Sequence, residues 1–216
     1  MKSISKNAIS ARVSSRKIIA KESEDIAVPS LKVEVDYKIT GKDGERKGTI
    51  ECKCFVKQFG QLLHMMFGGL TNYSVKDTAG ATKTPSAFLT DYRTLGCNAS
   101  AGVDNHGIVV GLDNTAVDIN DYVLASKCAH GTGADEFTYG GPVGFTITND
   151  DTSNTLKITR PFGNGSGSSI VVKEIGLIVY NNAGYFLVLR DIIDDPGLEV
   201  GSGETLTVNY KIKAIA

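Results

Sequence analysis

The cysteines are the residues whose chemistry is easiest to test from spacing alone. Cys52 and Cys54 stand two apart on an alternating stretch, whereas Cys97 and Cys128 are isolated. Structural zinc sites use C-x2-C pairs that are matched by a second pair of ligands, so this spacing predicts no zinc site. We expect free thiols, and a Cys97–Cys128 disulfide is an alternative that the sequence leaves open.

Three further stretches contain residue types that occur in catalytic or ligand sites. His130 lies in AHGTG, but the chain has no G-x-S-x-G or H-E-x-x-H pattern, which favours a turn residue or subunit contact. Residues Asp113–Tyr122 offer oxygen ligands without the spacing of a calcium loop. The glycine-rich Gly163–Ser169 joins two strand-like segments and lacks the lysine of a phosphate loop. We therefore predict no enzyme, no cofactor and no metal site.

Composition places the chain among β proteins. It has 216 residues, 24 of them glycine, with 5 prolines and no tryptophan, a balance typical of many strands joined by tight turns. The net charge of −1 gives no global basic surface that would indicate nucleic acid as a partner. No apolar run approaches the roughly 18 residues that cross a bilayer, and the N-terminus lacks the apolar core of a signal peptide. We expect neither a membrane partner nor export by that route.

The charge is unevenly distributed along the chain. Residues 1–21 carry six basic side chains and no acid, whereas residues 101–151 carry eight acids and one lysine. This opposition favours contact between copies of the chain or with a neighbouring protein, and a solvated tail beside a solvated face is the alternative. The candidate subunit-contact residues are Lys2, Lys6, Arg12, Arg16, Lys17, Lys21, Asp118, Asp121, Asp135 and Glu136.

Residues 1–30 are expected to form an extended basic N-terminal arm. The arm is rich in serine and lysine and cannot bury enough apolar surface to fold alone, so its order must come from another chain. Its apolar side chains favour addition as a strand to a sheet edge. The side chains that would make this contact are Ile4, Ile9, Val13, Ile18 and Ile19.

Hydrophobic periodicity predicts the elements that follow the arm. Alternation over residues 31–54 predicts a β-hairpin, and helical spacing over 55–67 predicts a short amphipathic helix. Residues 70–106 form a long polar excursion, and strand-like runs separated by glycine-rich turns occupy 107–216. We predict a mainly β chain in which residues 31–216 form an antiparallel β-sandwich of jelly-roll or immunoglobulin-like type. The hairpin and the helix are expected to pack beside the C-terminal sheet.

Charged residues within the predicted strands indicate sheet architecture. Alternation places Glu174 on the face opposite its apolar neighbours, and Gly176 would let a neighbouring chain or a large side chain approach. Arg160 and Arg190 follow strand cores and are expected to pair with Glu174 or Asp191. We interpret these residues as structural.

The C-terminal half, roughly residues 107–216, resembles a family of small virion proteins of tailed bacteriophages. The resemblance is carried by the order of the phrases GIVVGLDNTAVDINDYVLAS, AHGTGADEFTYG, TRPFGNGSGSSIVVKEIGLIV, YFLVLRDII and LEVGSGETLTVNYKIKA. Family members commonly show a Thr-Arg-x-Phe strand, a turn and a Val-x-Glu-x-Gly-Leu strand, here Thr159–Phe162 and Val172–Leu177. Their closing Gly-x-Thr-Leu-x-Val matches Gly203–Val208, and FVKQFGQLL is similar to a segment that precedes this half. The family supplies no catalytic residues.

The resemblance implies a non-enzymatic structural component of a tailed-phage particle, made in the host bacterial cytoplasm and located in the virion. Its expected partners are copies of itself and other virion proteins, reached through the arm and the sheet edges, with tail or neck as the expected position. A capsid decoration protein is an alternative. A host-surface or carbohydrate-binding β-sandwich is another, and it would need exposed aromatic side chains, which are few in a chain without tryptophan.

Overall fold

The computed structural model describes residues 30–52, 55–71, 73–86, 95–194 and 196–215. Apart from Ser30, the predicted N-terminal arm lies outside these ranges, and so does Cys54 at the end of the predicted hairpin. The described part is mainly β, with antiparallel sheets and one helix. The predicted β-sandwich-like fold class is therefore confirmed.

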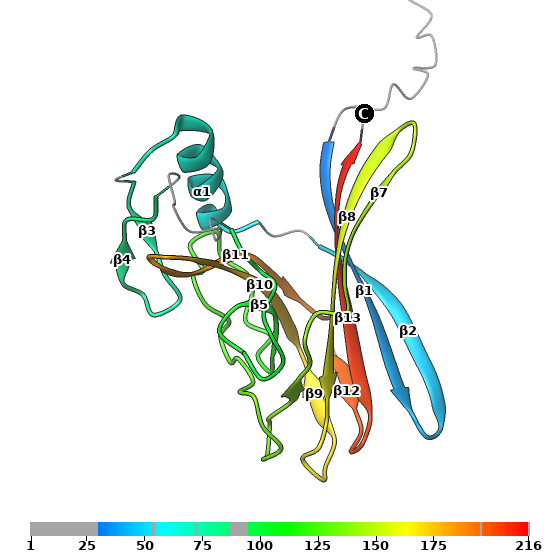
Figure 1. Cartoon of the computed structure of the whole chain (residues 1–216). Coiled ribbons are helices and arrows are strands. Elements are labelled where there is room, and N and C mark those ends of the chain that lie inside the picture. Colours follow the sequence, from blue (N-terminus) through cyan, green and yellow to red (C-terminus); the bar gives the residue numbers. More distant parts are fainter. Residues whose placement is uncertain (1–29, 53–54, 72, 87–94, 195, 216) are drawn as a thin grey trace, which may run out of the picture.

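The largest layer is an antiparallel sheet with the strand order β2-β1-β13-β8-β6, in which β7 also pairs with β8. Its strands are β1 (Ser30–Gly41), β2 (Gly44–Glu51), β6 (Thr138–Tyr139), β7 (Gly144–Asn149), β8 (Ser153–Gly163) and β13 (Thr205–Ile215). β13 is central, because it pairs with β1 on one side and with β8 on the other. The first and last strands of the described chain thus lie side by side (Figure 1).

A smaller antiparallel sheet with the order β11-β10-β5 faces this large sheet (Figure 1). Its strands are β5 (Gly107–Gly111), β10 (Glu174–Asn181) and β11 (Gly184–Ile192). Two further two-stranded ladders pair β9 (Ile170–Val172) with β12 (Leu198–Val200) and β3 (Val75–Lys76) with β4 (Thr82–Lys83). Every residue of β5 is buried, as expected for a continuous apolar run covered on both faces.

The one helix among the described residues, α1 (Lys57–Gly68), packs against β11. It begins two residues later than the predicted 55–67, because Phe55 forms an isolated bridge with Leu189 of β11 and so extends the small sheet. The helix ends at Gly69, whose φ of 60° is the left-handed conformation that glycine adopts without strain. In the part of the chain that the structure describes, no helix is long and apolar enough to cross a membrane.

The predicted hairpin over 31–54 forms, but its expected place was wrong. It does not pack beside the C-terminal sheet: β1 pairs with β13 at eleven positions, from Ser30 with Ile215 to Thr40 with Thr205. The hairpin is therefore part of the large sheet, and the strands of 107–216 are distributed over both layers. Local alternation reports which residues share a face, but it carries no information about which distant strand completes the backbone hydrogen bonds.

The two faces of the large sheet differ in chemistry. On the outer face, charged side chains pair across strands: Glu34 accepts hydrogen bonds from Lys211 at 3.1 Å and Lys213 at 2.9 Å. Lys211 also pairs with Asp36. The inner face is apolar, which is the arrangement of a sheet with one solvated side.

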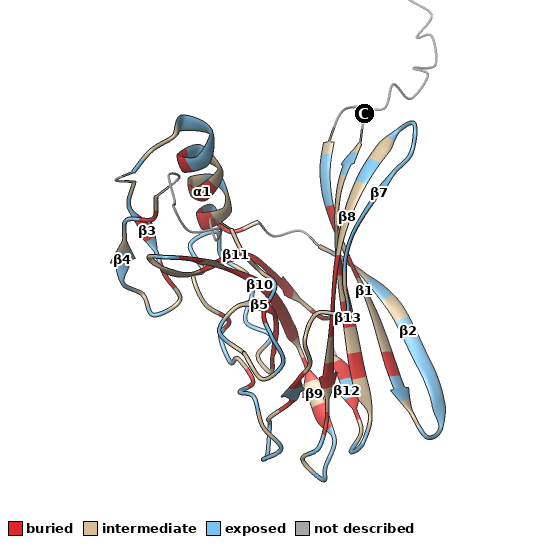
Figure 2. Cartoon of the chain, in the orientation of Figure 1, coloured by how far each residue is buried: buried red, intermediate tan, exposed pale blue. Residues whose placement is uncertain are grey.

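The inner face is fully covered at one end and only partly covered at the other. Its closed row runs across four strands through Ile39, Leu206, Phe162 and Tyr139, all at most 1% exposed. Its open row runs through Val33, Ile212, Leu156 and Ile147. Ile147 is 63% exposed. The two layers thus form a wedge, with a closed end at the closed row and an open end at the open row (Figure 2).

Candidate functional site

A buried charge cluster holds the small sheet to the loop that follows β5. The Arg190 guanidinium donates to Glu174 Oε2 at 2.9 Å and to Asp121 Oδ2 at 2.6 Å, and also to the Thr115 carbonyl at 3.1 Å. Glu174 is fully buried and accepts two backbone N–H groups, from Ala125 and from Ser126 at 2.7 Å. Every polar atom of the Glu174 carboxylate therefore has a partner, as a buried charge requires.

Glu174 is predicted to lie on the face of β10 opposite its apolar neighbours, and the structure shows that this face of the strand is buried as well. Gly176 pairs directly with Arg190, whose guanidinium reaches the Glu174 carboxylate two residues away along β10. A Cβ at Gly176 would collide with the Leu124 side chain, so the predicted close approach at this glycine is confirmed. Burial lowers the pKa of Arg190, but the hydrogen bonds that it donates to Asp121 and Glu174 outweigh this effect and raise the pKa overall.

Arg160 is buried differently, because its hydrogen bonds go to carbonyl oxygens. The guanidinium donates to Gly140 at 3.0 Å and to His106 and Ile108 at 2.9 Å, as well as to Val103. Its pairing with Glu174 or Asp191, which we had expected, does not occur. Burial lowers the pKa of Arg160. The side chain fastens the loop before β5 and the segment after β6 to the large sheet.

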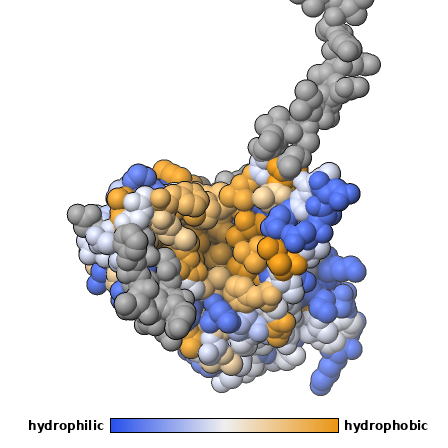
Figure 3. Space-filling view, turned by 45° about the horizontal axis from the view of Figure 1, so that its top comes forward, coloured by the Kyte–Doolittle hydropathy of each residue, from blue (hydrophilic) through white to orange (hydrophobic). Residues whose placement is uncertain are grey.

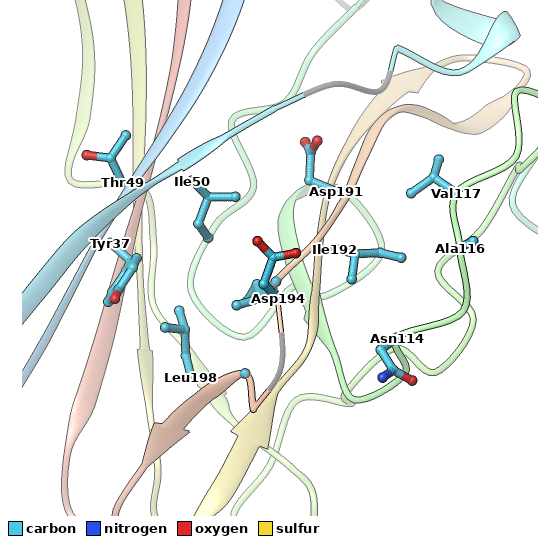
Figure 4. A pocket seen from close by; sticks show the side chains of 12 residues that line it. Tyr37, Thr49, Ile50, Asn114, Ala116, Val117, Asp191, Ile192, Asp194 and Leu198 are labelled. Carbon is cyan, nitrogen blue, oxygen red and sulfur yellow. The ribbon is translucent and has the colours of Figure 1, made fainter.

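A polar groove lies between the β1–β2 hairpin and the end of β11. It has a volume of about 800 Å³, and Figure 4 shows Asp194 in its middle, with Tyr37 and Leu198 on the hairpin side and Asn114 across from them. Carboxylate and amide groups beside an aromatic ring are suited to a ligand with several hydroxyl groups. Among the described residues, no group of three or more His, Cys, Asp or Glu side chains is arranged to hold a metal ion.

An apolar crevice opens between the layers at the open end of the wedge. Its volume is about 180 Å³, and Figure 3 shows it as a hollow lined by hydrophobic surface. One wall is formed by Leu156 and Ile158 of β8 with Ile212 of β13, and the facing wall by Phe59 and Leu62 of α1. An empty apolar cavity of comparable size, about 150 Å³, can accept a benzene-sized group. The crevice therefore has room for side chains from another segment.

Exposed apolar side chains continue the crevice along the inner face of the large sheet. Phe145 pairs with Ile158 and is 44% exposed, and Ile147 pairs with Leu156. Leu31, at the start of β1, is 48% exposed on the same face. An apolar patch of this kind on a water-facing surface marks a contact site for another chain.

The two edges of the large sheet also differ. β2 carries the exposed Glu45, Arg46 and Lys47, and Arg46 pairs with Glu204 at 2.6 Å. Among the described residues, β7 pairs with β8 alone, and its sequence GFTITN contains no charged residue. Charged side chains prevent further strands from adding to an edge, so β7 is the unprotected edge.

The structure places the predicted acidic contact residues in two separate loops. Asp121 is held by Arg190, and Asp118 accepts hydrogen bonds from the Asn120 backbone and side chain. Asp135 is exposed in a loop before β6, and Glu136 accepts the N–H of Gly133 at 2.8 Å. Asp121 is thus occupied within its own chain, whereas the contact role of the others stays a prediction. Their predicted partners lie outside the described residues: Lys2, Lys6, Arg12, Arg16, Lys17 and Lys21.

The thiols of Cys97 and Cys128 are free and are not joined by a disulfide. Burial raises the pKa of Cys97 to about 11 and that of Cys128 to about 12, so both are protonated and weakly nucleophilic at neutral pH. Cys97 lines the crevice, where it contributes apolar surface.

The sequence analysis missed the exposed apolar residues of β7. The available signal was the alternation of Phe145 and Ile147 with threonines, which is typical of a strand with one apolar face. What this alternation could not show is that the face would be left uncovered. That outcome depends on where α1 and the small sheet end.

Comparisons with protein-family models, with curated proteins and with solved structures found no match to this chain.

Proposed function

We propose that this chain is a non-enzymatic structural component of a tailed-bacteriophage particle, assembling with copies of itself and with other virion proteins through its N-terminal arm and its sheet edges. Tail or neck is the proposed position. The observation that carries the proposal is the uncharged β7 edge with its exposed Phe145 and Ile147 beside the partly covered open row. The resemblance of residues 107–216 to phage virion proteins supplies the biological setting.

The rest of the molecule is suited to such a role. Arg190 and Arg160 fasten loops from distant parts of the chain to the two layers, which gives a rigid scaffold for the exposed surface. A subunit that assembles needs surfaces that are incomplete until a neighbour arrives, and an apolar patch beside a free strand edge fulfils this requirement.

The proposal is tested by removing residues 1–21. The truncated chain should keep the circular dichroism spectrum and the thermal midpoint of the full chain, because the described sheets do not include these residues. It should fail to oligomerise in analytical ultracentrifugation and be absent from purified particles by mass spectrometry. The matched control carries the same 21 residues in scrambled order. A truncated chain that assembles like the full chain would exclude the arm from assembly, and absence of the full chain from particles would exclude the virion role.

The polar groove favours a second candidate function, binding of a carbohydrate at the host surface. Asp194 and Asn114 line the groove together with the ring of Tyr37, and such groups can bind sugar hydroxyl groups (Figure 4). Titration calorimetry with surface glycans of the host should then give binding that Asp194→Asn abolishes and Asp135→Asn, in an exposed loop away from the groove, leaves unchanged.

A further inference from the structure

The β7 edge is unusual because both its backbone and its inner face are available to a partner. In the part of the chain that the structure describes, β7 pairs with β8 on one side only, over Gly144 with Thr159 to Asn149 with Asn154. Phe145 and Ile147 point from this strand toward the open end of the crevice, since their partners Ile158 and Leu156 line it. A strand added to β7 would therefore gain backbone hydrogen bonds and an apolar surface in one step.

The N-terminal segment contains a sequence with the matching pattern. In residues 8–14, AISARVS, the apolar Ile9, Ala11 and Val13 alternate with serine and arginine. As a strand, this segment would present its three apolar side chains on one face and its polar side chains on the other. That is the pattern required at an edge whose inner side is apolar and whose outer side meets water.

Charge determines the direction of the added strand. The turn after β7 contains Asp150 and the exposed Asp151. The Asp150 carboxylate accepts hydrogen bonds from Thr152 and Ser153, which lower its pKa to about 2 and keep it charged at neutral pH. Arg16 and Lys17 follow the alternating segment in the sequence. They reach this turn when the added strand runs in the same direction as β7.

The register shows at which end of the sheet the donated segment must leave β7. Ser30 pairs with Ile215, and Ile215 pairs with Ser153, so β1 starts at the same end of the sheet as the end of β7. A strand added in the direction of β7 leaves at this open end. When the open ends of two copies face one another, the start of β1 in each copy comes near the end of β7 in the other, and both exposed apolar patches are covered at once.

We infer that residues 8–14 of a second copy of this chain add as a strand to β7, with Ile9, Ala11 and Val13 covering the open row. Two copies meet with their open ends facing one another, and each donates its segment to the other. The 15 residues between Ser14 and Ser30 span at most about 50 Å when extended, enough to cross such an interface. The exchange is reciprocal and closes on itself, as in a two-fold dimer. This inference rests on the proposed assembly function and names its partner and its site.

Photo-crosslinking of the full chain tests the occupant. Phe145 is replaced by p-benzoylphenylalanine, and equal amounts of ¹⁴N- and ¹⁵N-labelled protein are mixed before irradiation. We expect crosslinked peptides that join position 145 to residues 8–19 and that carry both labels. Crosslinks to residues 8–19 with a single label would show that each chain covers its own edge, and crosslinks to residues 87–94 or to another β7 would show a different occupant. Either result overturns the inference.

A matched pair of variants on β7 tests the energetic contribution of the site. Ile147→Lys should weaken the dimer about tenfold or more in sedimentation equilibrium, since a charge replaces an apolar contact at the centre of the interface. Thr148→Lys places the same charge on the opposite face of the strand and should leave the dissociation constant within about twofold. Unchanged dimerisation of Ile147→Lys overturns the inference. If the Ile147→Lys chain does not dimerise but still enters particles, the proposed virion function stands and the strand exchange is not required for it. If the unmodified chain is absent from particles, the proposed virion function is wrong, whatever the dimerisation result.

Discussion

The closed row and the open row follow the same strand pattern but differ in how far their side chains are buried. Both cross four strands of the large sheet, and both place apolar side chains on its inner face. Leu206 in the closed row is fully buried, whereas Ile147 in the open row is 63% exposed. The difference arises from what faces them. Strand pattern determines which side chains point inward, but the extent of the facing layer decides whether they form core or contact surface.

The largest effect is expected from loosening the facing layer. Arg190→Met leaves the buried Glu174 carboxylate without its cation, and breaking a buried pair in this way costs about 3–5 kcal/mol of unfolding free energy. Arg46→Met removes an exposed ion pair of the β2 edge and should cost at most about 1 kcal/mol. Urea unfolding of both variants measures the contrast. Equal losses would show that the buried cluster does not hold the small sheet in place.

A direct test of the two rows compares truncations in each. Leu206→Ala opens a cavity in the closed row and should destabilise the chain by about 2–5 kcal/mol. Ile147→Ala in the open row should change the stability of the isolated chain by no more than about 0.5 kcal/mol. Both values come from chemical denaturation at low protein concentration, where association does not contribute. A large loss at Ile147 would mean that the open row is core.

The charged β2 edge can be made to resemble the uncharged β7 edge. Replacing Glu45, Arg46 and Lys47 together by threonine gives β2 the uncharged character of β7. The exposed ion pairs that are lost contribute about 0–1 kcal/mol each, so stability should fall only slightly. Concentration-dependent association should appear in dynamic light scattering, because the charges no longer oppose strand addition. Lys32→Thr, on the outer face of β1, is the control and should stay unassociated.

The smallest expected effect concerns pH at the outer face of the open end. Hydrogen bonds from Lys213 and Lys211 lower the pKa of Glu34 from 4.5 to about 2. A carboxylate with a depressed pKa in the folded state stabilises the fold above its unfolded pKa and loses this contribution as the pH falls from about 4.5 to 2. For a partly exposed group the contribution is below about 1 kcal/mol. NMR titration of the Glu34 carboxyl carbon checks the value, and a midpoint near 4.5 would contradict the pairing.

The fold class and the inner-face residues of β1 could be predicted because they depend on local alternation. The burial of Glu174 could not, because the apolar surroundings of this residue are tolerated only when Arg190 of the neighbouring strand reaches it. The exposed crevice could not be predicted either. Leu156 and Phe162 lie on the same face of β8 and follow the same alternating pattern. Their different exposure depends on how far the small sheet and α1 extend, and these are formed by residues far away in the sequence.

The central position of β13 has a consequence for the order of events during synthesis. β1 is synthesised early, but the strand that pairs with it on the side opposite β2 is β13, the last strand of the described chain. At about 5–20 residues per second, the ribosome needs roughly 8–33 s to go from Gly41 to Thr205. Throughout this interval the β1–β2 hairpin lacks the partner that joins it to β8. A chain interrupted before Thr205 cannot join its two hairpins, so the complete open row exists only on chains whose translation has passed β13.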